Sequence, residues 1–162
     1  TQRAMFAQLE NVTILRSTMV FGKGDTHNSY GPNRFHNDLL RQNVVNLFGN
    51  GEELRDYIYI DDLIRCIISA IYEDIPGCFN IVTGKSISFS DLAKVMCLIN
   101  KGGTTIHLSR QVEISHRRYF TKHIENHFGF VPLPIIEGLN QMFSKEKITS
   151  CSVPASGGSD LR

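Results

Sequence analysis

The stretch GNGEELRDYIYIDD, residues 49–62, combines three signals of an α/β fold. It begins with a Gly-Asn-Gly turn, continues through an alternating strand at 57–60, and enters a helix with an acidic first turn. We expect Asp61 to cap this helix and both Asp61 and Asp62 to suit the positive end of its dipole. The helix should pack one broad apolar face on a sheet. That face is formed by Leu63, Ile64, Ile67, Ile68 and Ile71.

Strands and helices alternate on both sides of this stretch. Further strands are predicted at 12–15, 44–48, 79–82 and 105–108. Helices are predicted at the start of the chain (1–9), at 35–42, after a capping box at 88–91, and at 121–128 and 134–143. The alternation predicts an α/β fold, but these strands are too few and too short for a complete doubly wound sheet.

Composition narrows the class of protein. The chain has 162 residues and a formal net charge of +1, so one domain without a nucleic-acid-binding surface is expected. No apolar run is long enough for a membrane span and no targeting signal is evident, which makes the cytoplasm the default location. The four cysteines and the histidines lack ligand spacing, so no metal is expected. Residues 1–143 should form the folded portion, and 144–162 a disordered tail.

Five segments, in order, resemble the second half of the extended short-chain dehydrogenase/reductases, the NAD-dependent epimerase/dehydratase family. They are TILRSTMVFG, GNGEELRDYIYIDD, FNIVTG, SFSDLAKVM and FGFVPLPIIEGL, and they fall within residues 12 to 140. The resemblance implies an α/β fold comprising a partial Rossmann-type (doubly wound) sheet with a small α/β substrate-binding lobe. It implies NAD or NADP as the cofactor of the complete protein.

Two parts of the family's machinery are missing from this sequence. There is no glycine-rich dinucleotide fingerprint, because GKGDTHNSYG follows a late strand and does not open a helix at the required spacing. None of the five tyrosines has a lysine four positions later, so the catalytic Tyr-x-x-x-Lys pair is absent too. We therefore assign no catalytic residue and expect no cofactor binding by this chain alone.

The resemblance assigns substrate binding to two arginines. Arg55 matches an arginine that clamps the substrate diphosphate, work for which a fork of charged donors is well suited. The alternative is an ion pair of Arg55 with Asp56 or Asp62 that holds the turn. Arg110 matches a second phosphate-contacting arginine, with Arg117 and Arg118 as competitors for the role and a solvated surface charge as the alternative.

A second group of candidates comes from the segment before the first helix of the substrate lobe. Ser17 and Thr18 occupy a cofactor-facing position, and Met19 replaces a family asparagine, which puts a standard nucleotide-sugar substrate in doubt because a thioether cannot donate a hydrogen bond. Asn33 and Arg34 end the polar loop 27–34, which either contacts substrate hydroxyls or phosphate or is a self-satisfied surface turn.

The expected function is the substrate-binding half of an NAD(P)-dependent epimerase, dehydratase or reductase, incomplete for catalysis by itself. Its substrate would be a small, phosphate-bearing molecule such as a nucleotide sugar, and its partner the missing amino-terminal Rossmann half. A non-catalytic relic or interaction module is the alternative, and an RNA-binding relative is a third. The sequence leaves open a homodimer of the complete protein, the choice between NAD and NADP, and the substrate.

Overall fold

The computed structural model describes residues 11–111, 113–119 and 122–144. The expected helix at 1–9 and all but the first residue of the expected tail lie outside these residues. Strands pair two by two: β1 (Thr13–Ser17) with β6 (Gly77–Ile81), β2 (Met19–Phe21) with β5 (Tyr57–Tyr59), β3 (Val44–Phe48) with β8 (Thr104–Leu108), and β4 (Leu54–Arg55) with β7 (Ile87–Ser88). The helices are α2 (Pro32–Gln42), α3 (Ile60–Tyr72), α4 (Phe89–Ile99), α5 (Lys122–Phe128) and α6 (Ile135–Phe143).

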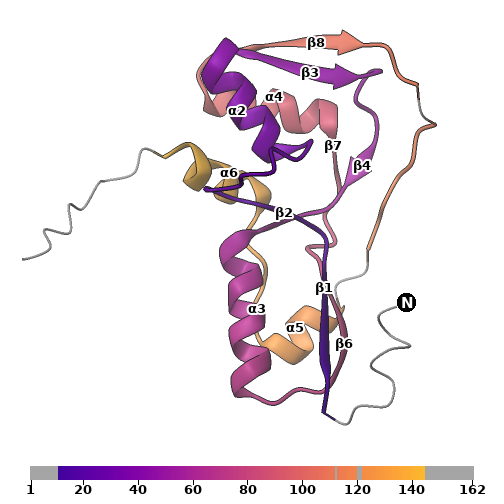
Figure 1. Cartoon of the computed structure of the whole chain (residues 1–162), viewed down its shortest axis with the longest axis vertical. Helices are drawn as coiled ribbons and strands as arrows, with labels where there is room; N and C mark the ends of the chain where they lie inside the picture. Colours follow the sequence, from indigo (N-terminus) through magenta and orange to yellow (C-terminus); the bar gives the residue numbers. More distant parts are fainter. Residues whose placement is uncertain (1–10, 112, 120–121, 145–162) are drawn as a thin grey trace, which may run out of the picture.

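The elements form two lobes joined by the β2–β5 pair (Figure 1). One lobe, here called the α2 lobe, holds α2, β3, α4, β8 and α6, and the other, the α3 lobe, holds β1, α3, β6 and α5. Three of the four strand pairs are parallel, and only β4–β7 is antiparallel. Parallel pairs linked by helices are the expected mark of an α/β fold.

Each lobe has its own hydrophobic core. The strand β5 contributes to both, because alternate side chains of a strand point to opposite faces. Tyr57 and Tyr59 pack into the core of the α2 lobe, whereas Ile58 packs into the core of the α3 lobe. The alternating pattern at 57–60 therefore marks a strand buried on both faces, and all three residues of β5 are buried.

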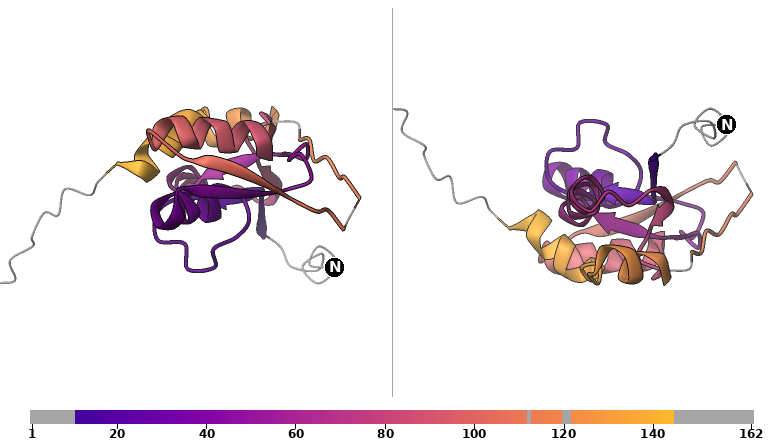
Figure 2. Two further views of the ribbon diagram at one scale, coloured as in Figure 1. Left: turned by 90° about the horizontal axis from the view of Figure 1, so that it is seen from above. Right: turned by 90° about the horizontal axis from the view of Figure 1, so that it is seen from below.

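In the α2 lobe, α2 and α4 lie beneath the β3–β8 ribbon (Figure 1), on either side of it when seen from above (Figure 2). The capping box before α4 is confirmed, because the Ser88 hydroxyl accepts a hydrogen bond from the Asp91 backbone N–H at 3.0 Å. The helix α2 begins three residues earlier than predicted. Pro32 occupies its first position, where the fixed φ of proline suits a helix start and the absent N–H costs nothing.

The predictions for α3 were partly wrong. The helix begins at Ile60 with Tyr59 as its N-cap and without a side-chain cap, so Asp61 does not cap it. Of the five apolar residues expected to face a sheet, four are exposed: Ile64 by 43%, Ile67 by 41%, Ile68 by 47% and Ile71 by 71%. The face toward the strands instead carries Leu63, Cys66 and Ala70, which pack on the core of the α3 lobe.

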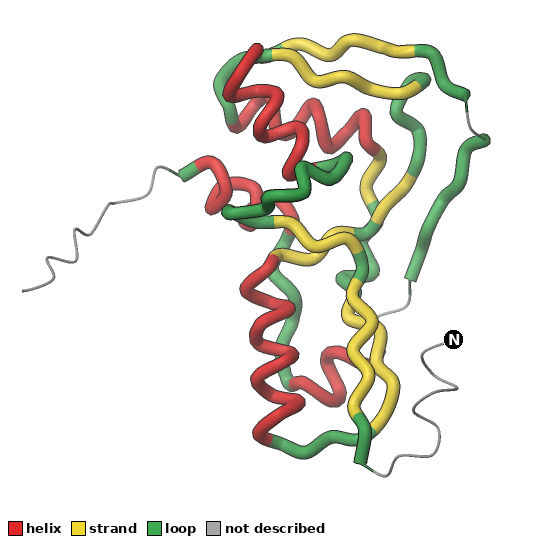
Figure 3. The backbone as a smooth tube through the Cα atoms, in the orientation of Figure 1, coloured by secondary structure: helices red, strands yellow, loops and turns green. Residues whose placement is uncertain are grey.

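After β8 the chain runs alongside β4 toward the α3 lobe (Figure 3). The Arg117 backbone N–H donates to the Leu54 carbonyl at 3.1 Å, and the Ser86 hydroxyl donates to the Arg117 carbonyl at 2.9 Å. These contacts keep the segment close to the end of β4. None of the helices in the described ranges combines the length and apolarity that crossing a membrane requires.

Candidate functional site

A cavity of about 820 Å³ opens where β4, the end of β8 and Tyr30 approach one another. Its wall combines aromatic rings with charged side chains, which is a common composition for a small-molecule site. The lining residues are Met19, Tyr30, Phe48, Glu53, Arg55, Phe89, Leu108, Ser109, Arg110, Gln111, Glu113 and Ser115. Three of the predicted substrate residues, Met19, Arg55 and Arg110, are therefore brought together here.

Arg55 ends β4, and its guanidinium is held by the segment that follows β8. One terminal nitrogen donates to the Leu54 carbonyl at 2.9 Å and to the Ser115 carbonyl at 2.5 Å. The other donates to the Ser115 hydroxyl at 3.2 Å and lies 3.3 Å from the Glu53 carboxylate. The guanidinium carbon also lies 5.7 Å from the centre of the Phe89 ring, within cation–π range.

The expected structural alternative for Arg55, an ion pair with Asp56 or Asp62, was wrong. The buried Asp56 carboxylate accepts hydrogen bonds from Thr83 and Gly84 instead. The buried Asp62 carboxylate accepts one from the Leu133 backbone N–H at 2.7 Å and pairs with Arg65 at 3.3 Å. Arg55 forms its ion pair with Glu53, a residue that the sequence did not single out.

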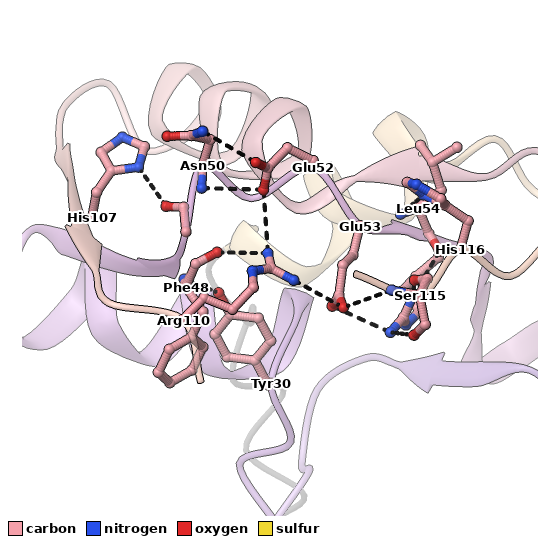
Figure 4. A network of polar contacts seen from close by, with 12 residues as sticks. Tyr30, Phe48, Asn50, Glu52, Glu53, Leu54, His107, Arg110, Ser115 and His116 are labelled. Carbon is pink, nitrogen blue, oxygen red and sulfur yellow. Dashed lines mark hydrogen bonds and ion pairs between the residues drawn. The ribbon is translucent and has the colours of Figure 1, made fainter. Parts of the chain in front are cut away.

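Arg110 follows β8 and reaches back over the turn at Gly49. Its guanidinium donates to the Phe48 carbonyl at 2.8 Å and pairs with Glu52 at 3.2 Å and Glu53 at 3.0 Å (Figure 4). Gly49 has a φ of 60°, and a Cβ there would lie 2.8 Å from Nε of Arg110. The predicted turn thus serves two purposes, since glycine supplies the left-handed backbone and leaves space for the arginine.

Aromatic rings form the other wall of the cavity. The Tyr30 ring centre lies 4.7 Å from that of Phe89 and 5.3 Å from that of Phe48. The Tyr30 hydroxyl donates to the Asn46 carbonyl at 3.2 Å and accepts from the Phe48 N–H at 3.3 Å, and burial raises its pKa. Tyr30 belongs to the polar loop 27–34 that the sequence singled out, but Phe48 and Phe89 were not identified, although a phenylalanine at a strand end was a signal in the sequence.

A smaller cavity of about 210 Å³ adjoins the first, and Met19 and Arg55 line both. Ser17 and Thr18, the predicted cofactor-side residues, line this second cavity together with Asp56, Arg117 and Tyr119. The Thr18 hydroxyl is engaged in a 2.8 Å hydrogen bond to the Asp56 carbonyl. The substrate-side and cofactor-side candidates of the sequence therefore lie in neighbouring cavities that meet at two shared residues.

Asn33 and Arg34 line neither of these two cavities. The buried Asn33 amide accepts from the Gly22 N–H at 3.2 Å and donates to Asp25 at 2.8 Å, which ties the glycine-bearing loop to α2. Arg34 lies 3.8 Å from Asp38 and 5.8 Å from the centre of the Tyr30 ring. Their structural contacts resemble the self-satisfied turn that was the alternative, and direct substrate contact stays a prediction.

The two competitors of Arg110 for the second phosphate contact lie outside the larger cavity. Arg118 is exposed, and Arg117 lines the second cavity but not the first, which leaves Arg110 as the second arginine of the larger cavity. Among the residues that the structure describes, no group of three or more His, Cys, Asp and Glu side chains could hold a metal ion.

Comparison with known proteins finds sequence similarity over about half of the chain. Residues 3–81 match the NAD dependent epimerase/dehydratase family. A dTDP-glucose 4,6-dehydratase of Escherichia coli is 30% identical over 81 residues, which are 44% of the chain and 22% of that protein. An ADP-L-glycero-D-manno-heptose-6-epimerase of Fusobacterium nucleatum is 35% identical over 78 residues, which are 48% of the chain and 22% of that protein.

A solved structure extends the likeness to most of the chain. The UDP-glucose 4-epimerase of Thermotoga maritima, solved with UDP-glucose, has a TM-score of 0.73 and 26% identity over 87% of the chain. The alignment takes in 48% of that protein, so the chain spans about half the length of this relative. The expected fold class, a Rossmann-type α/β fold, is thereby confirmed. Over residues 3–81 the chain is similar to the NAD-dependent epimerase/dehydratase family.

Proposed function

We propose that this chain is the substrate-binding portion of an NAD(P)-dependent epimerase, dehydratase or reductase that acts on a nucleotide sugar. In this proposal Arg55 and Arg110 hold the diphosphate, and Met19 lies between the substrate and the cofactor side. The observation that carries the proposal is the convergence of two guanidinium groups, from segments far apart in the sequence, on one cavity of about 820 Å³.

The chemistry of the cavity wall supports a nucleotide-linked ligand. Guanidinium groups provide planar, permanently charged forks of donors that match phosphate oxygens. Tyr30, Phe48 and Phe89 supply aromatic surface beside them, which suits the apolar faces of a base or sugar ring. Met19 adds a thioether that cannot donate a hydrogen bond, so it would favour a ligand with an apolar face at that point.

Two observations support a role that needs a second polypeptide segment. The sequence has neither a dinucleotide fingerprint nor a Tyr-x-x-x-Lys pair, so hydride and proton transfer would rely on residues outside it. Ile64, Ile67, Ile68 and Ile71 form an exposed apolar stripe on α3, of a kind that a soluble fold usually covers. We propose that the rest of a Rossmann sheet, with its helices, supplies both the cofactor site and this cover.

A non-catalytic role is the second candidate, favoured by the same exposed stripe on α3. In that case the chain would use the stripe to bind a partner, and the cavity would have no ligand. An RNA-binding role has less support, because the net charge is +1 and the two arginines of the cavity are paired with carboxylates.

The test is calorimetric titration of UDP-glucose into the 162-residue chain and into Arg55→Lys and Arg110→Lys. Each variant keeps the charge but loses the two-pronged geometry, so binding should weaken by about tenfold to a hundredfold. Arg41→Lys, at an exposed position near the end of α2, is the matched control and should bind like the parent chain. Equal affinity of all four proteins, or no binding by the parent chain, would contradict the proposal.

A further inference from the structure

The carboxylate of Glu53 lies between the two arginines of the cavity. One of its oxygens is 3.0 Å from the Arg110 guanidinium and also accepts the Ser115 N–H at 3.2 Å. Its other oxygen is 3.3 Å from the Arg55 guanidinium. The side chains of Glu53 and Arg110 are each 17% exposed and that of Arg55 is 15% exposed, so solvent screens this triad less than it screens a surface pair. Figure 4 shows Glu53 between Arg110 and Ser115.

The charges of the cavity wall cancel. Arg55 and Arg110 contribute two positive charges, and Glu53 and Glu113 contribute two negative ones. Glu52, at the edge, pairs with Arg110 as well. A site that holds a doubly anionic diphosphate by electrostatic attraction needs a surplus of positive charge. The cavity wall has no such surplus while Glu53 stays between the two arginines.

Both arginines have acceptors other than Glu53. Arg55 also donates to the backbone carbonyls of Leu54 and Ser115, and Arg110 donates to that of Phe48. These acceptors are main-chain atoms and would remain if Glu53 were neutral. The distinctive effect of Glu53 is therefore to occupy guanidinium donors and offset their charge at the point where the two arginines approach each other.

We propose that Glu53 is an internal competitor for the ligand diphosphate, an autoinhibitory contact that must turn away from Arg55 and Arg110 before a nucleoside diphosphate can bind. The inference rests on the proposed function, because it takes the two arginines to be the diphosphate clamp. Its consequence is that Glu53 sets the affinity of the site below what the arginines alone would give. The bound nucleotide is thereby released more readily.

The experiment is calorimetric titration of UDP into the full 162-residue chain and into Glu53→Gln and Glu73→Gln at low ionic strength. The amide keeps the size of the side chain and removes its charge. Glu53→Gln should bind UDP about tenfold more tightly than the parent chain, which equals about 1.4 kcal/mol. Glu73→Gln is the matched control because Glu73, the exposed C-cap residue of α3, lines neither cavity, and it should change affinity by less than about threefold.

The outcomes separate this inference from the proposed function. If the parent chain binds UDP and Glu53→Gln binds it equally or less tightly, Glu53 is a brace, and the inference is overturned while the clamp stands. If no protein of the series binds UDP, the clamp and the inference fail together. Thermal melting checks that each variant is folded. Should Glu53→Gln not fold, Glu53→Ala is judged by the same criteria.

Discussion

Replacing Asp56 with alanine should lower the free energy of unfolding by about 3 kcal/mol. The Asp56 residue is 1% exposed, and its carboxylate accepts the Thr83 N–H at 3.0 Å, the Thr83 hydroxyl at 3.0 Å and the Gly84 N–H at 2.6 Å. A donor left without an acceptor costs about 1–3 kcal/mol. The Thr83 hydroxyl can rotate toward another partner, whereas the two backbone N–H groups cannot. The costs of leaving these two N–H groups unpaired add up to the expected loss of about 3 kcal/mol.

The assay is urea unfolding followed by circular dichroism, with Asp61→Ala as the control. Asp61 is an exposed aspartate in the first turn of α3, where its removal should cost less than about 1 kcal/mol. A loss of about 3 kcal/mol corresponds to a fall in melting temperature on the order of 10 °C for a chain of this size. If Asp56→Ala and Asp61→Ala are equally stable, the three hydrogen bonds of Asp56 contribute less to the free energy of unfolding than expected here.

Three further predictions concern single side chains. Among the described residues the buried Tyr57 hydroxyl has no hydrogen-bond partner. Tyr57→Phe should therefore leave the free energy of unfolding in urea unchanged or raise it by up to about 1 kcal/mol, and a loss of stability would contradict this. Burial raises the pKa of Cys66 to about 11, so at pH 8 only about one Cys66 thiol in a thousand is ionised. Iodoacetamide labelling followed by mass spectrometry should therefore modify the exposed Cys78 before Cys66, which should react only near pH 11 or on unfolding. Equal labelling of the two cysteines at pH 8 would refute this. Gly49→Ala should displace the Arg110 guanidinium and weaken UDP-glucose binding about tenfold in calorimetry, whereas unchanged affinity would show that the close approach is unimportant.

Local signals in the sequence predicted much of the fold. The strand at 44–48 and the capping box at Ser88 depend on neighbouring residues only, and both agree with the structure. The helix α3 was predicted as an element, but the face it buries was not, because helical spacing alone does not decide which of several apolar residues meet the strands. Cys66 and Ala70 face the core since they are small enough for close packing there.

The candidate site was only partly predictable. Arg55 and Arg110 were identified through family resemblance, and the structure places both in one cavity. Glu53 was not identified, because its importance comes from lying between two arginines that are 55 residues apart in sequence, and such a meeting depends on how the segment after β8 folds back along β4. Tyr30 was identified only as part of the polar loop 27–34, and its contact with the Phe48 ring was missed because the two rings meet only in the folded chain.

The measurement that tests the central claim most directly is the map of backbone amide chemical-shift changes when UDP-glucose is added to the isotopically labelled chain. The account predicts that the largest changes fall at Phe48, Arg55 and Arg110, at the wall of the larger cavity. The cleft of about 420 Å³ that includes Lys23 and His36 should change little. Changes concentrated at that cleft, or no changes with millimolar ligand, would contradict the assignment of the Arg55 and Arg110 cavity as a nucleotide-sugar site.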